Sequence, residues 1–364
     1  MNSRLVKILK IIKESNLDAV ALIAGPNLKY ITGADFHLME RPTILIISKN
    51  FKPVAILPHL EVDSFKVSDF DAEIISWKDS EGFYDAFIKA GKMIGNLQKI
   101  GVEGQRMRVF EFDIIKKAFP DAEVIDTHKE IVKIRLCKDE EEIQNLRKAI
   151  KISEDALEKT IGNLKEGVSE LQIVQDLIVN QYDGGAHSLA FNPIALIGEN
   201  AALPHGHSGE RKLKKGDALL IDFGCVYNGY NSDFTRTYFY KEVSEQHRKL
   251  YEVVKEANQI GQNIVKSGVS LHKIDDTVTN FLEQSSYNKC IVHRTGHGLG
   301  MDVHEDPYVV RGNNQKLEKG MVITIEPGLY DQGNVGVRIE DNVLVSDDGF
   351  ESLTNLSREL MIVG

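Results

Sequence analysis

The pattern of apolar and polar positions predicts an α/β region in the first part of the chain. Short apolar runs alternate there with segments whose apolar residues recur at helical spacing. An amphipathic helical stripe covers Met1–Ser15, and a loop follows at Thr32–Pro42. The expected strands are Ala19–Ile23, Thr43–Ser48, Val54–Leu57, Lys99–Val102 and Ala122–Ile125, and the further expected helices are Ser80–Leu97 and Val109–Ala118.

A charged segment, Lys133–Glu142, leads from this region into a helix that is expected to continue to Ile161. We therefore place a domain boundary near residue 132. This boundary gives an N-terminal domain of residues 1–131 and a larger domain of residues 132–364. A chain of 364 residues is long enough for two domains, each with its own core.

The larger domain contains a faint internal repeat. Glu154–Ile178 aligns with Lys255–Thr279 at a constant offset of 101 residues. In each copy a helix ends at a glycine, and Ser169 or Ser270 is expected to cap the next helix. Because Gly-x-Ser is common between helices, the match can arise by chance. Otherwise it indicates two related α/β halves that face each other across a central site.

Leu219–Tyr240 is predicted to form a β-hairpin, because Asn228-Gly229 lies between apolar, aromatic and β-branched runs. A turn at these two residues places Asp222 opposite Thr235. Asp222 and Asp233 then lie on one face of the hairpin as diagonal neighbours. Two carboxylates turned into a folded sheet need a neutralising charge, and a divalent cation is the simplest one. The hairpin alone leaves open the alternative of two solvent-facing aspartates.

Histidines cluster in two glycine-containing segments. Five of the eleven histidines lie in Ile291–Pro307 or in Pro204–His207. Glycine lets the backbone approach a ligand closely, so this clustering indicates a functional site more than isolated core or surface histidines. The candidates that we retain are His205, His293, His297 and His304.

Two further acids are associated with apolar strands. Val322–Ile325 is predicted to be a buried strand, and Glu326 ends it directly before Pro-Gly. In Val335–Val345 the alternation places Arg338 and Glu340 on one face. A single acid of this kind is usually a rim residue. Two such acids, together with an aspartate pair and a histidine cluster, indicate a site.

The amino-acid composition limits the classes of molecule that the protein is expected to bind. The content of 42% hydrophobic and 27% charged residues is typical of a globular protein. A net charge of −10 argues against nucleic acid or an anionic membrane as a partner, and no apolar run approaches the length of a membrane span. Three distant cysteines and the absence of a signal-peptide pattern lead us to expect a cytoplasmic protein without disulfides.

The candidate ligands together supply four carboxylates and one imidazole. They are Asp222, Asp233, His297, Glu326 and Glu340. This oxygen-rich set contains no thiolate. It is therefore more typical of a site for catalytic Mn²⁺, Co²⁺, Fe²⁺ or Zn²⁺ than of a structural zinc site, which would use Cys and His. Four negative charges can neutralise two divalent ions, and two neighbouring ions can activate a water between them.

The motifs around these residues, in the order DFG, SDFTRT, TGHGLG, IEPG and RIED, resemble those of the metallopeptidase superfamily of methionine aminopeptidase and prolidase. The resemblance extends over essentially the whole chain. It implies an α/β fold in which a creatinase-like N-terminal domain precedes a pita-bread catalytic domain with a pseudo-twofold repeat. The N-terminal domain, the PHG motif and the closing RIED are similar to those of Xaa-Pro dipeptidase (prolidase) and Xaa-Pro aminopeptidase (aminopeptidase P).

The resemblance also implies a role for each ligand. Asp222 would hold one ion, His297 and Glu326 the other, and Asp233 and Glu340 would bridge the two. The expected metals are Mn²⁺ or Co²⁺, with Zn²⁺ or Fe²⁺ as alternatives. Glu326 is also expected to carry a proton during the reaction.

Other active-site residues of the superfamily match His205, His293, His304 and Arg338, which are expected to bind substrate and stabilise the tetrahedral intermediate. The expected substrate is a small peptide with proline in the second position. It would be cleaved before the proline, at an amide without an N–H, by polarising its carbonyl. The Thr32–Pro42 loop resembles one that reaches the partner's active site in family homodimers, so a homodimer and a substrate contact for His37 are expected.

Several alternatives stay open within and beyond this superfamily. Methionine aminopeptidases generally lack such an N-terminal domain, and creatinase-type relatives lack the metal ligands that are present here. Glu340 follows Glu326 by only 14 positions, which resembles the compact prolidase pattern more than that of aminopeptidase P. A non-catalytic binding module and a hydrolase of a small non-peptide amide on the same fold are the remaining alternatives.

Overall fold

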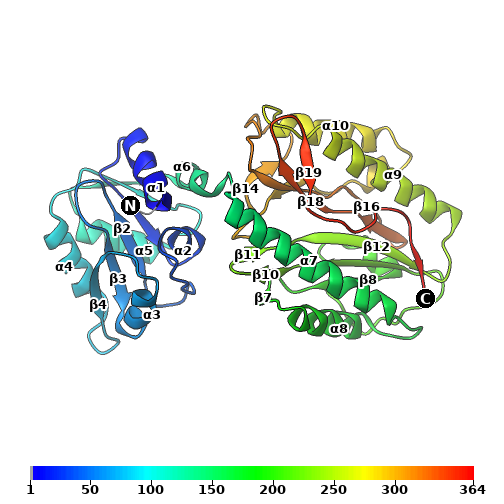
Figure 1. Cartoon of the computed structure of the whole chain (residues 1–364), viewed down its shortest axis with the longest axis horizontal. Helices are drawn as coiled ribbons and strands as arrows, with labels where there is room; N and C mark the ends of the chain where they lie inside the picture. The colour runs from blue at the N-terminus through cyan, green and yellow to red at the C-terminus, as the bar shows by residue number, and fades with distance from the viewer. Residues whose placement is uncertain (1–2) are drawn as a thin grey trace. The chain divides into compact units, whose positions relative to one another are not determined.

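The computed structural model describes residues 3–364 and divides into two compact units, the first ending at Arg135 and the second beginning at Leu136. Figure 1 colours the first unit from blue to cyan and the second from green to red. Met1 and Asn2, the start of the expected helical stripe, lie outside the described residues. Among residues 3–364, no helix is both long and apolar enough to cross a bilayer.

The first unit contains a six-stranded mixed sheet. Its strands are β1 (Ala19–Ile23), β2 (Ile44–Ile47), β3 (Val54–Pro58), β4 (Glu73–Trp77), β5 (Lys99–Val102) and β6 (Glu123–Asp126). Their order is β4-β3-β2-β1-β5-β6. β1 pairs antiparallel with β2 and parallel with β5, so the sheet combines a meander with parallel crossovers.

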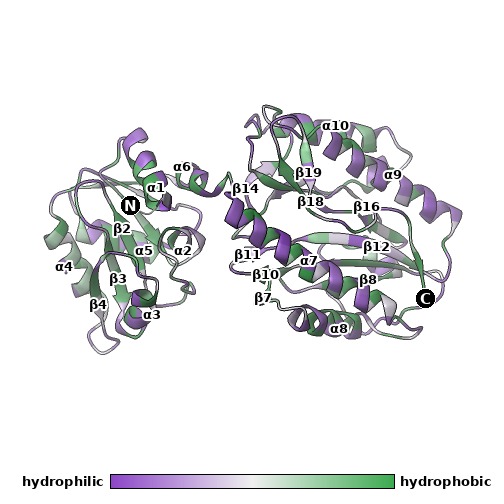
Figure 2. Cartoon of the chain, viewed as in Figure 1, coloured by the Kyte–Doolittle hydropathy of each residue, from purple (hydrophilic) through white to green (hydrophobic). Residues whose placement is uncertain are grey.

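Helices accompany this sheet throughout the first unit. They are α1 (Ser3–Glu14), α2 (Pro26–Thr32), the 3₁₀ helix η1 (His59–Glu61), α3 (Val62–Val67), α4 (Tyr84–Ile94), α5 (Val109–Ala118), α6 (His128–Ile131) and the 3₁₀ helix η2 (Val132–Arg135). The expected boundary near residue 132 falls in η2. Ile46 and Ile56 of the central strands belong to one buried cluster with Phe87 of α4 and Ile115 of α5. The strands are correspondingly hydrophobic in Figure 2.

The short helices α2, α3, α6, η1 and η2 and the strand β4 were absent from the predicted pattern of the first unit. α2 has only one to two turns, so its apolar period is too short to identify, although Pro26 is a residue favoured in the first helical turn. β4 is an edge strand in which only Ile75 and Trp77 are buried. Two of its five residues, Glu73 and Ser76, are polar, so it lacks the continuous apolar run by which the other strands were predicted.

The second unit begins with two helices, and two more follow at its middle. They are α7 (Glu140–Gly162), α8 (Glu170–Asp183), α9 (Glu245–Asn263) and α10 (Leu271–Glu283). The predicted caps of α8 and α10 are confirmed, since Ser169 Oγ accepts the N–H of Gln172 and Ser270 Oγ accepts the N–H of Lys273, both at 3.2 Å. Each cap contributes about 1 kcal/mol to helix stability.

The strands of the second unit form two larger and two smaller sheets. They are β7 (Ser188–Leu189), β8 (Ile194–Ile197), β9 (Ala218–Phe223), β10 (Cys225–Tyr227), β11 (Tyr230–Asn231), β12 (Phe234–Tyr240), β13 (Gly296–Gly298), β14 (Glu305–Val309), β15 (Val322–Ile325), β16 (Gly328–Asp331), β17 (Val335–Arg338), β18 (Asp341–Val345), β19 (Phe350–Ser352) and β20 (Ile362–Val363). The larger sheets have the orders β20-β12-β9-β8 and β14-β13-β15-β18-β19. The 3₁₀ helices η3 (Gly198–Ala202) and η4 (Asn288–Cys290) lie between strands and helices.

The predicted repeat is present as two halves with the same pattern of pairing. Ser169 bridges to Lys212 in the first half, and Ser270 bridges to Lys316 in the second. The offset is 101 residues between the serines and 104 between the lysines, so the second half is three residues longer between these points. β9 and β15 follow at the offset of 104, and each is the strand at the centre of its own half.

The hairpin register predicted from the sequence is confirmed. Asp222 of β9 pairs with Thr235 of β12, and Tyr227 pairs with Tyr230 next to the turn. Asn228 and Gly229 both have positive φ, 49° and 82°, as a type I′ turn requires. The turn therefore sets which side chains share a face.

The apolar stretch Val335–Val345 differs from the single alternating segment that the sequence indicated. It consists of two strands, β17 and β18, separated by Ile339 and Glu340. β17 pairs with β16, whereas β18 pairs with β15 and β19. The chain thus passes from one sheet to another at Glu340, which places this carboxylate where the sheets meet.

Candidate metal centre

All five predicted ligands line one cavity of about 980 Å³ in the second unit. Asp222 lies near the end of β9, Asp233 directly precedes β12, and His297 is the central residue of β13. Glu326 follows β15 and Glu340 lies between β17 and β18. Strands that are distant in the sequence therefore bring five side chains to one place.

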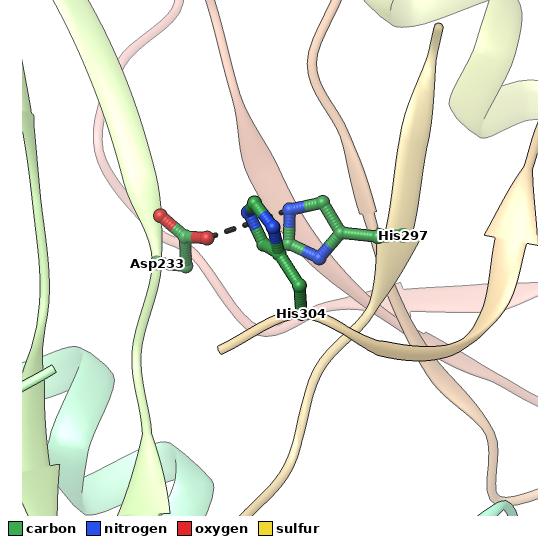
Figure 3. Close-up of side chains that lie close together, drawn as sticks. All are labelled: Asp233, His297 and His304. Atoms are coloured by element: carbon green, nitrogen blue, oxygen red, sulfur yellow. Dashed lines mark ion pairs between the residues drawn. The ribbon is translucent and has the colours of Figure 1, made fainter. Parts of the chain in front are cut away.

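The ligand atoms form three overlapping groups. In each group the atoms lie within 4.8 Å of one another. The groups are Asp233, His297 and His304; His297, Glu326 and Glu340; and Asp222, Asp233 and Glu340. Figure 3 shows the first of these groups, with the His297 and Asp233 side chains facing each other. The arrangement contains every predicted ligand and adds His304.

His297 is oriented by its own strand. Its Nδ1–H donates to the carbonyl of Gly298 at 3.0 Å, which leaves the Nε2 lone pair free. Nε2 lies 3.5 Å from Asp233 and 3.4 Å from Glu326. Glycine flanks His297 because a Cβ at Gly296 would lie 2.0 Å from the carbonyl oxygen of Thr324. Burial lowers the pKa of His297 to about 3, so the ring is neutral, as a metal ligand must be.

The carboxylates raise one another's pKa values. Burial, and then Glu340 and Asp222, raise the pKa of Asp233 well above its usual range. Burial, and then Glu326 and Asp222, do the same to Glu340. Burial raises the pKa of Glu326 to about 7, although Arg338 acts in the opposite direction. Ionised acids at this separation require a compensating positive charge.

Two carboxylate oxygens point to where that charge would lie. Asp222 Oδ1 and Glu340 Oε1 are buried, and neither has a hydrogen-bond partner among residues 3–364. Buried oxygens are rarely left in this condition, since desolvation without a partner costs about 1–3 kcal/mol. A divalent cation bound by hard oxygen ligands satisfies both oxygens. The residues present therefore fit a metal site.

Arg338 organises two of these acids. It is buried and donates from Nη2 to Asp222, from Nε to Thr235 Oγ1 at 2.8 Å and from Nη1 to Tyr330 at 2.7 Å. Thr235 in turn donates to Glu340 Oε2 at 2.8 Å. One guanidinium therefore holds Asp222 directly and Glu340 through a hydroxyl. Thr235 and Tyr330 were not among the predicted site residues.

Asp233 is held by its backbone. The side-chain amide of Asn342 donates to the Asp233 carbonyl and accepts the Asp233 N–H at 3.4 Å. Asn342 follows Glu340 by two residues and is fully buried. Asn342 of β18 therefore fixes the backbone of Asp233 and lies two residues after another candidate ligand, Glu340.

His293 belongs to a chain of hydrogen bonds that begins at Arg338. Its Nδ1–H donates to the Arg294 carbonyl at 2.7 Å, and its Nε2 accepts the hydroxyl of Tyr330 at 2.8 Å. Burial, with Arg338 next, lowers the pKa of His293 to about 4, so the ring stays neutral. Both ring nitrogens are thus engaged within the protein, although the side chain lines the cavity.

His205 and His304 also line the cavity and are exposed. The His304 ring lies 4.0 Å from that of His297, centroid to centroid. Arg294 lines the same cavity, lies over the Tyr308 ring at 4.6 Å and donates from Nε to the Gly296 carbonyl at 3.2 Å. Unlike Arg338, it has no carboxylate partner among residues 3–364. The remaining walls are apolar, formed by Phe191, Ile194, Pro204, Val303 and Val310.

A buried ion pair supports the loop that bears His304. Lys138 Nζ lies 2.7 Å from Glu305 Oε1, and both side chains are at most 5% exposed. Sequence reasoning missed this pair, because Lys138 stands in a charged segment that looks like a solvated connection. His37, by contrast, lies in an exposed loop of the first unit, and its predicted contact with substrate stays a prediction.

Comparison with known proteins gives two family matches that together span most of the chain. Residues 144–347 match the model of metallopeptidase family M24, and residues 4–137 match that of the creatinase/prolidase N-terminal domain. In sequence, the chain is 35% identical over 360 residues to an uncharacterized peptidase of Staphylococcus aureus (strain USA300), with 97% of this chain and 100% of the relative covered.

Solved structures of both candidate enzyme types are similar to this chain. Prolidase from Thermococcus sibiricus has a TM-score of 0.93 at 34% identity and covers 99% of this chain and 98% of its own. X-Pro aminopeptidase from Thermotoga maritima MSB8 has a TM-score of 0.88 at 30% identity and covers 99% of each chain. The predicted fold class and family resemblance are thereby confirmed, whereas the overall likeness does not separate the two activities.

Proposed function

The chain belongs to metallopeptidase family M24, and from this premise we propose that it hydrolyses the peptide bond between an N-terminal residue and proline. Dipeptides are the preferred substrates in this proposal, and Xaa-Pro aminopeptidase activity on longer peptides is the alternative. One observation carries the proposal. The cavity that holds the acid cluster also holds Arg294, a guanidinium without a carboxylate partner among residues 3–364.

The charges of a dipeptide match those of this cavity. A dipeptide carries an ammonium and a carboxylate close together, and both must lose water on binding. The acid cluster favours the ammonium, and Arg294 can receive the carboxylate in a two-pronged hydrogen bond. A longer peptide places its carboxylate farther along the chain, where this guanidinium no longer meets it. The apolar walls suit the proline ring and an apolar N-terminal side chain.

We propose that five residues hold two divalent ions in this cavity. They are Asp222, Asp233, His297, Glu326 and Glu340, with Asp233 and Glu340 as bridging ligands. Two bound ions supply an activated water and polarise the scissile carbonyl. The two buried carboxylate oxygens without hydrogen-bond partners support this assignment. Mn²⁺ or Co²⁺ is the proposed metal, and Fe²⁺ or Zn²⁺ is compatible with the same ligands.

Glu326 is the proposed proton carrier. Burial raises the pKa of Glu326 to about 7 in the metal-free protein, and a general acid or base must lie within reach of the proton that it moves. Its side chain is 16% exposed, which leaves it accessible from the cavity. It would take a proton from the attacking water and deliver it to the proline nitrogen as the bond breaks.

The remaining polar side chains are assigned to substrate. His205 and His304 are exposed in the cavity, so their ring N–H groups can donate to the substrate and to the developing oxyanion. Arg338 acts mainly by holding Asp222 and Thr235. A direct contact of His293 with substrate would require its hydrogen bond with Tyr330 to rearrange. A homodimer in which His37 contacts substrate is part of the same proposal.

Hydrolysis of matched substrates by the purified protein with Mn²⁺ tests the proposal. The substrates are a Xaa-Pro dipeptide and a Xaa-Pro-Xaa tripeptide with the same first residue. Preference for the dipeptide supports prolidase activity, and preference for the tripeptide moves the assignment to aminopeptidase P. Asp233→Asn and Glu340→Gln are expected to be inactive. If neither peptide is cut while Mn²⁺ is bound, the substrate class is wrong and the metal site stands.

A further inference from the structure

Each half of the second unit contains one buried carboxylate outside the metal centre that binds backbone N–H groups of a histidine-bearing loop. Glu170 is the first residue of α8, and Asp275 lies in α10. Glu170 is 0% exposed and Asp275 is 4% exposed. We call these two residues the loop-base carboxylates. Neither lines the cavity, and neither is part of the proposed chemistry.

Glu170 joins the two ends of the loop that bears His205. Its Oε1 accepts the N–H of Ile197 at 2.7 Å, at the end of β8, and the side-chain amide of Asn200 at 2.9 Å. Its Oε2 accepts the N–H of Gly209 at 2.8 Å. Residues 198–208 lie between the two backbone donors. This segment includes η3 and the PHGH motif, so the carboxylate closes its base.

Asp275 makes the corresponding connection in the second half. Its Oδ1 accepts the N–H of Thr295 at 2.8 Å, one residue before β13. Its Oδ2 accepts the N–H of Arg311 at 2.9 Å, after β14. Residues 296–310 lie between these donors and contain His297 and His304. The second carboxylate therefore closes the base of the loop that supplies a proposed metal ligand.

The two carboxylates do not occupy equivalent positions in the repeat. At the helix offset of 101 residues, Glu170 corresponds to Leu271 and Asp275 corresponds to Val174. The internal duplication alone therefore does not account for the second carboxylate once the first is present. Both carboxylates accept two backbone N–H groups, one on either side of a histidine-bearing loop. They do so from different positions in the corresponding helices α8 and α10. A shared requirement of the two loops explains this better than shared ancestry of the residues.

The chemistry explains why a carboxylate is used. Its two oxygens accept from two separate N–H groups at once, and ionised acceptors form the stronger hydrogen bonds. An amide of the same shape has one oxygen, and its NH₂ group would face the second N–H. A buried charge in a unit that already has a cluster of acids is costly. Its presence at both loops indicates that the loop bases must be held firmly.

We propose that the loop-base carboxylates are positioning residues of the active site. Asp275 fixes the segment that presents His297 to the metal, and Glu170 fixes the segment that presents His205 to the substrate. The part concerning His205 rests on the proposed function, whereas the part concerning His297 rests on the metal centre alone. Outer-shell contacts of this kind typically change metal affinity or activity by about 10–100-fold.

The test compares two isosteric variants, Asp275→Asn and Glu170→Gln, with control carboxylates on the same helices, the half-buried Asp276 and the exposed Asp176. The controls are Asp276→Asn on α10, which ion-pairs with the Arg311 side chain, and Asp176→Asn on α8. Each protein is assayed for the Kd of Mn²⁺ by competition with a fluorescent chelator, and for kcat and KM on a Xaa-Pro dipeptide. Folded fractions are matched by circular dichroism before each assay.

Asp275→Asn is expected to weaken Mn²⁺ binding about tenfold or more. Glu170→Gln is expected to leave the Mn²⁺ affinity within about threefold of the wild type and to lower kcat/KM about tenfold. The controls should match the wild type in both assays. A folded Asp275→Asn protein with the wild-type Kd, or a folded Glu170→Gln protein with the wild-type kcat/KM, overturns the corresponding half of the proposal. Because Mn²⁺ binding needs no peptide, the Asp275 result stands even if the proposed peptidase activity fails.

If a variant does not fold, hydrogen exchange measured on the wild-type protein replaces the assays of that variant. The amides of Ile197, Gly209, Thr295 and Arg311 are expected to exchange as slowly as those of β9, although only Ile197 of these four lies in a strand. Exchange of Gly209 and Arg311 at the rate of their exposed neighbours would show that the loop bases open freely and would refute the proposal.

Discussion

Arg338 donates hydrogen bonds to three different residues around the candidate metal centre. Its three nitrogens donate to Asp222, Thr235 and Tyr330, so the acids are held by one rigid, planar group. Tyr330 in turn donates a hydrogen bond from its hydroxyl to His293. Burial raises the pKa of Tyr330 to about 12, which keeps its hydroxyl protonated and able to donate to the imidazole. Asp222, Glu340 and His293 are thus oriented by neighbours that are themselves held in place.

Arg294→Met is expected to reduce dipeptide binding selectively. Methionine keeps much of the apolar stem but removes the charge that would receive the proline carboxylate. A hydrogen bond to a charged group contributes roughly 1.5–3 kcal/mol, so KM for a Xaa-Pro dipeptide should rise by about 10–100-fold. The tripeptide should change far less. Steady-state kinetics on both peptides measure the difference.

Arg248→Met is the matched control for this prediction, because Arg248 is exposed on α9 and does not line the cavity. It should behave as the wild type with both peptides. Equal losses for dipeptide and tripeptide in Arg294→Met would instead place this guanidinium on a part of the substrate that both peptides share, and the argument for dipeptide preference would fail.

Mn²⁺ binding is expected to strengthen as the pH rises towards 7. Burial raises the pKa of Glu326 to about 7, and the carboxyl must lose its proton to bind metal. Below pH 7 the affinity should therefore fall by about tenfold per pH unit for this one proton, and above pH 7 this dependence should level off. Chelator competition at a series of pH values measures the slope, which should be shallower in Glu326→Gln. A Kd that is constant from pH 5.5 to 7.5 would contradict the prediction.

The raised pKa has the opposite effect on the metal-free protein. The folded state keeps the Glu326 proton above the pH at which an unfolded glutamate, with a pKa near 4.3, has lost it. Between about pH 4.5 and 7 the folded state therefore binds more protons than the unfolded state, and this group makes folding less favourable as the pH rises. Thermal unfolding in the presence of a chelator would detect this trend.

At the scale of elements, local signals predicted most of the architecture. Asn228-Gly229 fixed the hairpin register because a type I′ turn admits few residues, and the caps at Ser169 and Ser270 were visible as serines after glycines. Short or edge elements such as α2 and β4 could not be predicted, since their apolar pattern is too brief. The local signal is strong where backbone chemistry restricts the choice of residue.

The supporting residues of the site could not be predicted for a different reason. Thr235 and Tyr330 look like ordinary strand residues, and their importance depends on partners that only the folded chain brings near. Lys138 lies 167 residues from Glu305 in the sequence, and Arg338 lies 116 residues from Asp222. No local pattern encodes such pairs. The five candidate ligands could be selected from the sequence because their residue types and motifs are unusual, and all five line one cavity.

Lys138→Met is expected to destabilise the second unit strongly. The substitution removes the ammonium 2.7 Å from Glu305, a carboxylate that is only 5% exposed. Removing one member of a buried ion pair typically costs about 3–5 kcal/mol. Chemical unfolding should show a lower midpoint, and Lys138→Met combined with Glu305→Gln should recover part of the loss. The exposed pair offers a control, since Lys151→Met removes an ion pair with Asp155 and should change stability by about 1 kcal/mol or less. Equal effects of the two lysine substitutions would contradict the prediction.

At the scale of the whole second unit, the metal centre is shared between the two halves of the repeat. Asp222 and Asp233 belong to the first half, whereas His297, Glu326 and Glu340 belong to the second. Asp222 and Glu326 are also equivalent by the offset of 104 residues that relates β9 to β15. Each half thus places an acid at the equivalent position near the end of its central strand, β9 or β15. Ions bound by these acids would join the two halves.

Metal removal is therefore expected to lower the melting temperature of the second unit. An ion that binds only the folded state stabilises it by about 2.7 kcal/mol at a free concentration of 100 times its Kd. For a unit of this size each kcal/mol corresponds to roughly 2–4 °C, so Mn²⁺ should raise the melting temperature by about 5–11 °C over the chelated protein. Calorimetry with excess Mn²⁺ or with a chelator measures the shift. Asp233→Asn should lose most of it because this residue contributes to two of the three ligand groups. An equal shift in the wild type and in Asp233→Asn would mean that the stabilising ion binds elsewhere.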